Sequence, residues 1–126
     1  MNGASVRYLV DDVDMAVTFY TELLGFAKEA QMGDGFAIVS RDGLRLLLTG
    51  TGGPGGAAQP TPDGRFPEPG GWNRIQLEVA DAAAETERLR AAGATFRGDL
   101  IKGRGGTQIV LEDPAGNPIE LFEPAG

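Results

Sequence analysis

The sequence predicts an α+β fold built from two copies of one unit, in which a strand and a helix precede three further strands. The first observation is an alternating strand, a capped amphipathic helix ended by glycine, and three short strands in the first half of the chain; the same order returns in the second half. The second is that residues 6–12 align with 75–81, and residues 43–48 align with 116–121. Together they indicate an internal repeat.

The first copy begins with a strand, because residues at every second position from Val6 to Val10 share one apolar face. Asp11-Asp12 supplies an N-cap, and apolar residues then recur at helical spacing from Val13 to Leu24. Gly25 can end this helix in the left-handed conformation. Three strands separated by turn residues complete the copy, near 26–32, 36–41 and 44–49.

The second copy repeats this order. A strand from Ile75 to Val79 leads to a helix capped by Asp81, which runs to about Ala92 and ends at Gly93. Proline and glycine within 113–117 are typical of a reverse turn. Three strands are expected near 95–102, 107–112 and 118–123.

The two copies are joined by residues 50–71, a segment of 22 residues with eight Gly and five Pro. A structureless segment of this length is usually either mobile or functional. It is interpreted as a flexible linker or as a lid over a cavity between the copies, and Phe66 and Trp72 near its end favour the lid. The whole chain, 1–126, is expected to be one domain, with copies at 4–50 and 72–124.

The composition excludes several classes of function. The chain has no Cys and no His, so it lacks a disulfide, a thiolate site, an imidazole ligand and a Ser-His-Asp triad. Eleven Lys+Arg against 18 Asp+Glu give a charge of −7, which argues against binding nucleic acid or an anionic membrane. Because neither a signal peptide nor a long apolar run is visible, a cytoplasmic location is expected.

Two motifs identify a family. Residues 10–26 contain V-x-D-V-D followed by F-Y-x-x-L-L-G-F, and residues 113–121 read D-P-x-G-N-x-I-E-L. In this order, within an internal repeat, they resemble the vicinal oxygen chelate superfamily, which includes glyoxalase I, bleomycin-resistance proteins and extradiol dioxygenases. The resemblance implies the glyoxalase/bleomycin resistance fold, in which two βαβββ modules form paired curved sheets around a trough. It also leads us to expect a homodimer, because sheets in this superfamily pair to cover an open face.

Members that use a metal hold it with four side chains, from the first and last strand of each module. The matching positions here are Ser5, Leu47, Arg74 and Glu120. Only Glu120 is a good ligand for a divalent ion, and Arg74 places a positive charge where the cation would bind. The resemblance therefore implies no metal and no other cofactor, and it disfavours the activities that require imidazole.

Strand alternation assigns the remaining residues of the trough. Arg7, Arg45 and Arg74 either pair internally with Glu78, Glu112 and Glu120, or orient a polar ligand. Tyr8 and Tyr20 are expected in the core, whereas Glu112 and Asp113 are expected to be solvated in a turn. The candidate ligand-binding residues are Arg7, Leu9, Arg45, Leu47, Phe66, Trp72, Arg74, Gln76, Gln108, Glu120 and Phe122.

The function that the sequence favours is metal-independent binding of a small aromatic or polar ligand. By resemblance to the bleomycin-resistance branch, the protein would sequester an aromatic antibiotic or natural product and confer drug resistance without chemistry. One alternative is a metal-free lyase or isomerase with Glu120 as general base and Arg74 as oxyanion partner. A regulatory or structural domain is a third hypothesis. No nucleic-acid or membrane partner is expected.

Overall fold

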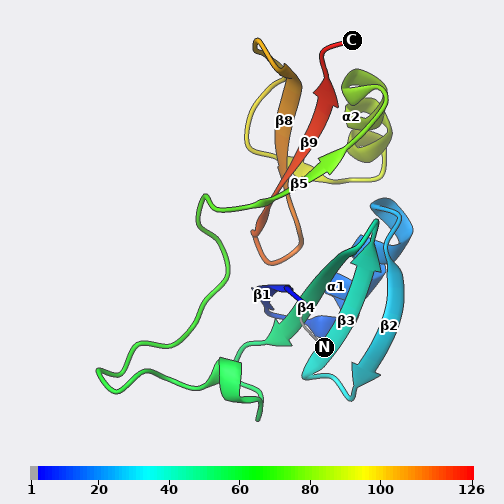
Figure 1. Cartoon of the computed structure of the whole chain (residues 1–126). Helices are drawn as coiled ribbons and strands as arrows, with labels where there is room; N and C mark the ends of the chain where they lie inside the picture. Colours follow the sequence, from blue (N-terminus) through cyan, green and yellow to red (C-terminus); the bar gives the residue numbers. More distant parts are fainter. Residues whose placement is uncertain (1–2) are drawn as a thin grey trace. The chain divides into compact units, whose positions relative to one another are not determined.

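The computed structural model describes residues 3–126 and shows two compact units, the first ending at Pro69 and the second running from Gly70 to Gly126 (Figure 1). Each unit has its own sheet and helix, so the predicted α+β class and the repeat are confirmed. Among the described residues, no helix has the length and apolar character that crossing a membrane requires.

The first unit is a four-stranded sheet in the order β1-β4-β3-β2. A helical segment lies between β1 and β2 along the chain. Strand β1 pairs with β4 in parallel, and the other neighbours are antiparallel. The elements are β1 (Val6–Val10), α1 (Val13–Thr18), η1 (Phe19–Leu23), β2 (Ala27–Met32), β3 (Phe36–Arg41) and β4 (Leu44–Gly50).

The predicted cap of the first helix is confirmed, since the Asp12 carboxylate accepts a hydrogen bond from the Met15 amide at 3.0 Å. The helix does not stay regular to Leu24, however, and its last turn, η1, is a π-helix. The carbonyl of Tyr20 accepts the Phe26 amide at 3.1 Å across Gly25, whose φ is +72°. This closure packs the Tyr20 ring edge-on against Phe26, with the ring centroids 5.3 Å apart.

The core of the first unit lies between the sheet and this helical segment. Side chains of alternating parity on β1, β3 and β4 pack against the apolar stripe of the helix, as the sequence predicted. Tyr8 and Tyr20 are 7% and 0% exposed, so their assignment to the core is confirmed. Other buried members are Val10, Val13, Ala16, Val39, Leu46 and Leu48.

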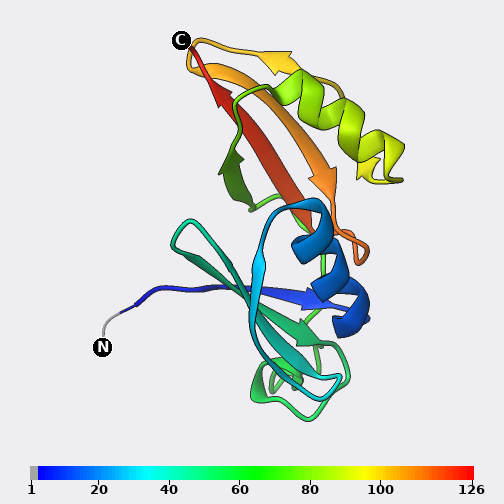
Figure 2. The same cartoon turned by 90° about the vertical axis from the view of Figure 1, so that its right-hand side faces the viewer.

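The second unit repeats this topology, with strand order β5-β9-β8-β6 and β5 parallel to β9 (Figure 2). Helix α2 begins after Asp81, whose carboxylate accepts the Ala84 amide at 3.0 Å, and covers one face of the sheet. The elements are β5 (Ile75–Glu78), α2 (Ala82–Ala91), β6 (Thr95–Phe96), β7 (Ile101–Lys102), β8 (Gly106–Glu112) and β9 (Pro118–Pro124).

The prediction of one strand over 95–102 is wrong. The chain pairs with β8 as two separate two-residue strands, β6 and β7, and residues 97–100 leave the sheet. Gly98 and Asp99 lie at the break, and both residue types are poor strand formers.

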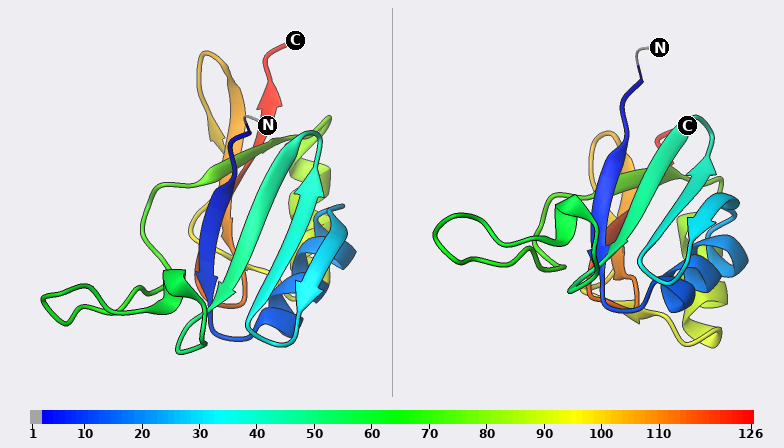
Figure 3. Two further views of the ribbon diagram at one scale, coloured as in Figure 1. Left: turned by 60° about the horizontal axis from the view of Figure 1, so that its bottom comes forward. Right: turned by 90° about the horizontal axis from the view of Figure 1, so that it is seen from below.

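The connecting segment is more ordered than a structureless linker. It contains a short 3₁₀-helix, η2 (Gly56–Ala58), beside the end of β4, and a loop that extends beyond the sheet of the first unit (Figure 3). The Gln59 side-chain amide donates to two glycine carbonyls at 3.1 Å. In the loop, the Thr61 hydroxyl donates to Asp63 and lowers the pKa of that carboxyl below its ordinary value.

Candidate functional site

The face of the second sheet that lies opposite α2 carries a hydrogen-bonded cluster around Glu120. One carboxylate oxygen of Glu120, Oε1, accepts a hydrogen bond from Arg74 Nε at 3.0 Å and lies 2.9 Å from Arg74 Nη2 in an ion pair. The other oxygen, Oε2, accepts from Gln76 Nε2 at 2.7 Å. The Glu120 side chain is only 10% exposed. Pairing of Arg74 with Glu120, one of the two interpretations drawn from the sequence, is thus present.

These contacts occupy most of the hydrogen-bond acceptor positions of the Glu120 carboxylate. A carboxylate has about four lone-pair positions, and here two hydrogen bonds and the ion-pair contact of Arg74 Nη2 are already directed at them. The cluster is also charge-balanced, because the guanidinium of Arg74 neutralises the carboxylate. The third nitrogen of the Arg74 guanidinium, Nη1, donates a hydrogen bond to the Trp72 carbonyl at 3.3 Å and so joins the cluster to the tryptophan.

Trp72 lies just before β5 and is 69% exposed, yet it is held in place. The guanidinium carbon of Arg97 lies 4.6 Å from the centroid of the indole ring. Arg97 also donates to Glu112 Oε2 at 2.7 Å and to the carbonyls of Gly71 and Gly116 at 2.6 and 2.9 Å. Sequence reasoning missed Arg97, because its pattern was that of an ordinary strand residue and nothing local indicated these distant partners.

The expectation that Glu112 and Asp113 are solvated is wrong. Glu112 pairs with Arg97, and Asp113 is only 4% exposed. The Asp113 carboxylate accepts from the amides of Ala115 and Asn117 at 2.9 Å and from the Asn117 side chain at 3.0 Å. The Asp113 carboxylate is buried because it accepts hydrogen bonds from turn amides that have no backbone carbonyl within reach.

The corresponding face of the first sheet is more apolar. Arg7 donates to the Thr49 hydroxyl at 3.0 Å, and Arg45 donates to the Ser5 hydroxyl at 3.3 Å. Each of these arginines thus bonds a hydroxyl group of its own unit. The apolar members of this face, placed by strand register and alternation, are Leu9, Leu47, Phe36 and Ile38.

The predicted residues fall into three groups. Trp72, Arg74, Gln76 and Glu120 form one bonded cluster in the second unit, and Phe122 pairs in register with Gln108 on the same sheet. Arg7, Leu9, Arg45 and Leu47 lie on the first sheet. Phe66 lies in the connecting loop and is 65% exposed. Sequence reasoning missed Thr49, Phe36 and Ile38, although alternation along 36–41 could have identified the last two.

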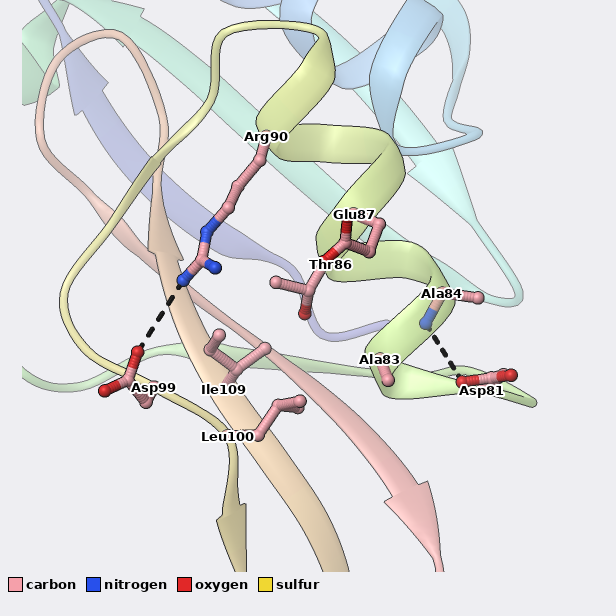
Figure 4. Close-up of a pocket in the computed structure, with 9 residues that line it drawn as sticks. All are labelled: Asp81, Ala83, Ala84, Thr86, Glu87, Arg90, Asp99, Leu100 and Ile109. Carbon is pink, nitrogen blue, oxygen red and sulfur yellow. Dashed lines mark hydrogen bonds and ion pairs between the residues drawn. The ribbon is translucent and has the colours of Figure 1, made fainter.

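A separate groove of about 390 Å³ lies on the helix side of the second unit (Figure 4). Arg90 spans it toward Asp99, with an N–O distance of 3.8 Å, and stacks over Phe96 at 5.1 Å. The sequence did not predict this groove. Its lining residues are Asp81, Ala83, Ala84, Thr86, Glu87, Arg90, Asp99, Leu100 and Ile109.

Comparison with known proteins identifies the family. Residues 6–122, nearly the whole chain and both units, match the family described as "Glyoxalase-like domain". The chain belongs to the glyoxalase-like domain family. Its structural neighbours place it in the glyoxalase/bleomycin resistance/dioxygenase superfamily, which confirms the resemblance read from the two motifs.

The relatives of this glyoxalase-like chain carry varied descriptions. "Uncharacterized protein YurT" of Bacillus subtilis (strain 168) is 36% identical, with 90% of this chain and 92% of that protein covered. A superfamily member from Sphaerobacter thermophilus DSM 20745 is 26% identical, with a TM-score of 0.74 and 98% and 97% of the two chains covered.

Two further structural neighbours are described as binding antibiotics. The bleomycin-binding protein of Streptomyces verticillus, solved with copper(II)-bleomycin, is 25% identical, with a TM-score of 0.64 and coverage of 99% and 98%. TnmS3, an antibiotic binding protein from Streptomyces sp. CB03234, is 26% identical, with a TM-score of 0.69 and coverage of 98% of each chain.

The residues of this glyoxalase-like chain do not fit the metal that the superfamily implies. Arg74 occupies one implied ligand position, and it bonds Glu120, the only strong ligand of the four, at 2.9 Å. Ser5 and Leu47, at the other two positions, add a neutral hydroxyl and an alkyl chain. Within residues 3–126, no three carboxylate side chains gather as a cation would require.

We therefore predict that the protein holds no specific divalent ion. Elemental analysis of protein purified without chelator is expected to find Zn, Ni, Fe and Mn each well below one ion per chain. Binding of a divalent ion at Glu120 would require breaking the Arg74–Glu120 ion pair and placing the ion beside the Arg74 guanidinium. One firmly retained ion per chain would contradict the prediction.

Proposed function

We propose that this glyoxalase-like protein binds an aromatic small molecule, such as an antibiotic or natural product, and sequesters it without chemical change. The observation that carries this proposal is Trp72, an indole that is 69% exposed but fixed by Arg97. An exposed, immobile aromatic ring is suited to stacking on a planar ligand, because little rotational freedom is lost on binding.

The polar cluster beside Trp72 supports the same proposal. Arg74, Gln76 and Glu120 are locked to one another, which favours orientation of a ligand over proton transfer. To act as a general base, Glu120 would have to use acceptor capacity that these contacts leave free, or give up one of them. Similarity to two antibiotic-binding proteins supports the ligand class.

The first test uses Trp72 as its own reporter, since it is the only tryptophan of the chain. Titration with a panel of planar antibiotics, including metal-free bleomycin, is expected to quench Trp72 fluorescence. Replacing Trp72 with alanine is expected to weaken binding, measured by calorimetry, by about 2- to 150-fold, the range for loss of an aromatic stack. Binding of unchanged affinity in Trp72→Ala would contradict the proposed platform.

The second test separates sequestration from the enzyme hypothesis. Mass spectrometry and chiral chromatography of the bound compound after long incubation are expected to recover it unchanged. Glu120→Gln, which keeps the size of the side chain, is then expected to change affinity only modestly. Turnover that falls about 100-fold or more in Glu120→Gln while binding survives would instead assign Glu120 as a general base and overturn sequestration.

A further inference from the structure

Trp72 has backbone contacts that are unusual for an exposed loop residue. Its carbonyl accepts from Arg74, and the two residues before it are also fixed. The Gly70 amide donates to Asn117 Oδ1 at 2.8 Å, and the Gly71 carbonyl accepts from Arg97 Nη1 at 2.6 Å. Gly70 and Gly71 have φ of +112° and +90°, which other residues rarely adopt, so this path to Trp72 requires glycine.

Arg97 connects this path to the indole ring. Its three kinds of nitrogen are directed at three separate partners, Glu112, Gly71 and Gly116, while its flat side faces Trp72. The Arg97 side chain is only 15% exposed, so these bonds hold it in one orientation. Glu112 balances its charge at 2.7 Å.

From this geometry we propose that Arg97 is a positioning residue for ligand binding: it holds the indole of Trp72 as a rigid stacking platform, and Glu112 and the 113–117 turn hold Arg97. The guanidinium packs on the indole ring, and the 69% exposure of Trp72 leaves ring surface available to a planar ligand. Lysine cannot replace arginine in this role, because an ammonium group has neither the flat face nor the fixed fork of donors.

This inference rests on the proposed function, but it makes a separate prediction for the ligand-free protein. Time-resolved fluorescence anisotropy of the unmodified chain is expected to show Trp72 turning with the whole protein, without fast local rotation, although the ring is exposed. In Arg97→Lys we expect a fast local component and a modest rise in acrylamide quenching, because the ring face that Arg97 covers becomes accessible. Arg104→Lys, an exposed turn position at the other end of β8 from Glu112, is the matched control and is expected to change neither measurement.

Binding supplies the second readout, with metal-free bleomycin as the probe. Arg97→Lys is expected to weaken binding by about 5- to 30-fold, the loss of a cation–π contact and of an ordered platform. Glu112→Gln, which keeps both the fork and the stack, is expected to give a smaller change in the same direction. If Arg97→Lys does not fold, two measurements still test the positioning role: weaker binding in Glu112→Gln supports it, and fast local rotation of Trp72 in the unmodified chain overturns it.

The outcomes separate the two proposals. Fast local rotation of Trp72 in the unmodified chain, or an Arg97→Lys chain with the same anisotropy and quenching as the parent, overturns the positioning role whatever binds. A Trp72 that is rigid in the unmodified chain and loosened in Arg97→Lys, in a chain that binds neither bleomycin nor any compound of the antibiotic panel, upholds Arg97 as the residue that holds the indole and rejects sequestration of this ligand class. Equal loss of order in Arg97→Lys and Arg104→Lys would show a general effect of substitution and would also overturn the inference.

Discussion

Gly106→Ala is expected to lower the free energy of unfolding by about 3 kcal/mol or more, enough to disrupt the second unit. Gly106 begins β8 with φ of +154° and pairs with Pro124. A Cβ at this position would overlap the backbone carbonyl of Glu123 and approach the Phe122 ring to 3.0 Å. Because the obstacle is the backbone of β9, it cannot move without breaking the pairing of the two strands.

The neighbouring glycine is a matched control. A Cβ at Gly105 would lie 3.8 Å from the Phe122 ring, an ordinary van der Waals contact, and Gly105→Ala is expected to change stability by less than about 1 kcal/mol. Urea unfolding followed by circular dichroism measures both variants. Equal stability of the two alanine variants would contradict the assigned clash.

Asp113→Ala is expected to cost about 3 kcal/mol or more, which lowers the Tm by roughly 10 °C for a chain of this size. The substitution removes the acceptor for two backbone amides and for the Asn117 side chain at a residue only 4% exposed. Donors left without a partner in a buried turn lose their hydration as well as their bond. Differential scanning calorimetry measures the shift.

Asp113→Ala is also expected to loosen Trp72, because the same turn presents the Gly116 carbonyl to Arg97 and the Asn117 side chain to Gly70. Asp99→Ala is the control, since the Asp99 side chain is 96% exposed, and its effect is expected to stay within about 0.5 kcal/mol. A Tm for Asp113→Ala as high as that of Asp99→Ala would show that the turn does not depend on the carboxylate.

The sequence predicted those parts of the fold that depend on local chemistry. The caps at Asp12 and Asp81 and the alternating strands could be read because each depends on residues a few positions apart. The π-turn after Thr18 has no comparable local signal. The break between β6 and β7 was missed although Gly98 and Asp99, two poor strand formers, lie within it, because propensity is a weak signal on its own.

In the candidate site, too, some features could be predicted from the sequence and others could not. The pairing of Arg74 with Glu120 was accessible to the sequence, since both positions followed from strand alternation and from the repeat. The environment of Trp72 was not, because Arg97, which contacts its ring, and Gly116, which bonds Arg97, come from separate parts of the chain. A charged residue in a strand pattern does not reveal whether its side chain is solvated or bonded to a distant turn.

The parallel pairing of first and last strands affects how each unit forms. Val6 pairs with Leu46, about forty residues later, whereas β2, β3 and β4 are joined by short turns. Loop-closure entropy therefore favours early formation of the β2–β3–β4 meander, with β1 added last. On a ribosome adding roughly 5–20 residues per second, β1 emerges several seconds before its partner exists. Its unpaired edge during that interval is the point at which a nascent chain is most exposed to misassociation.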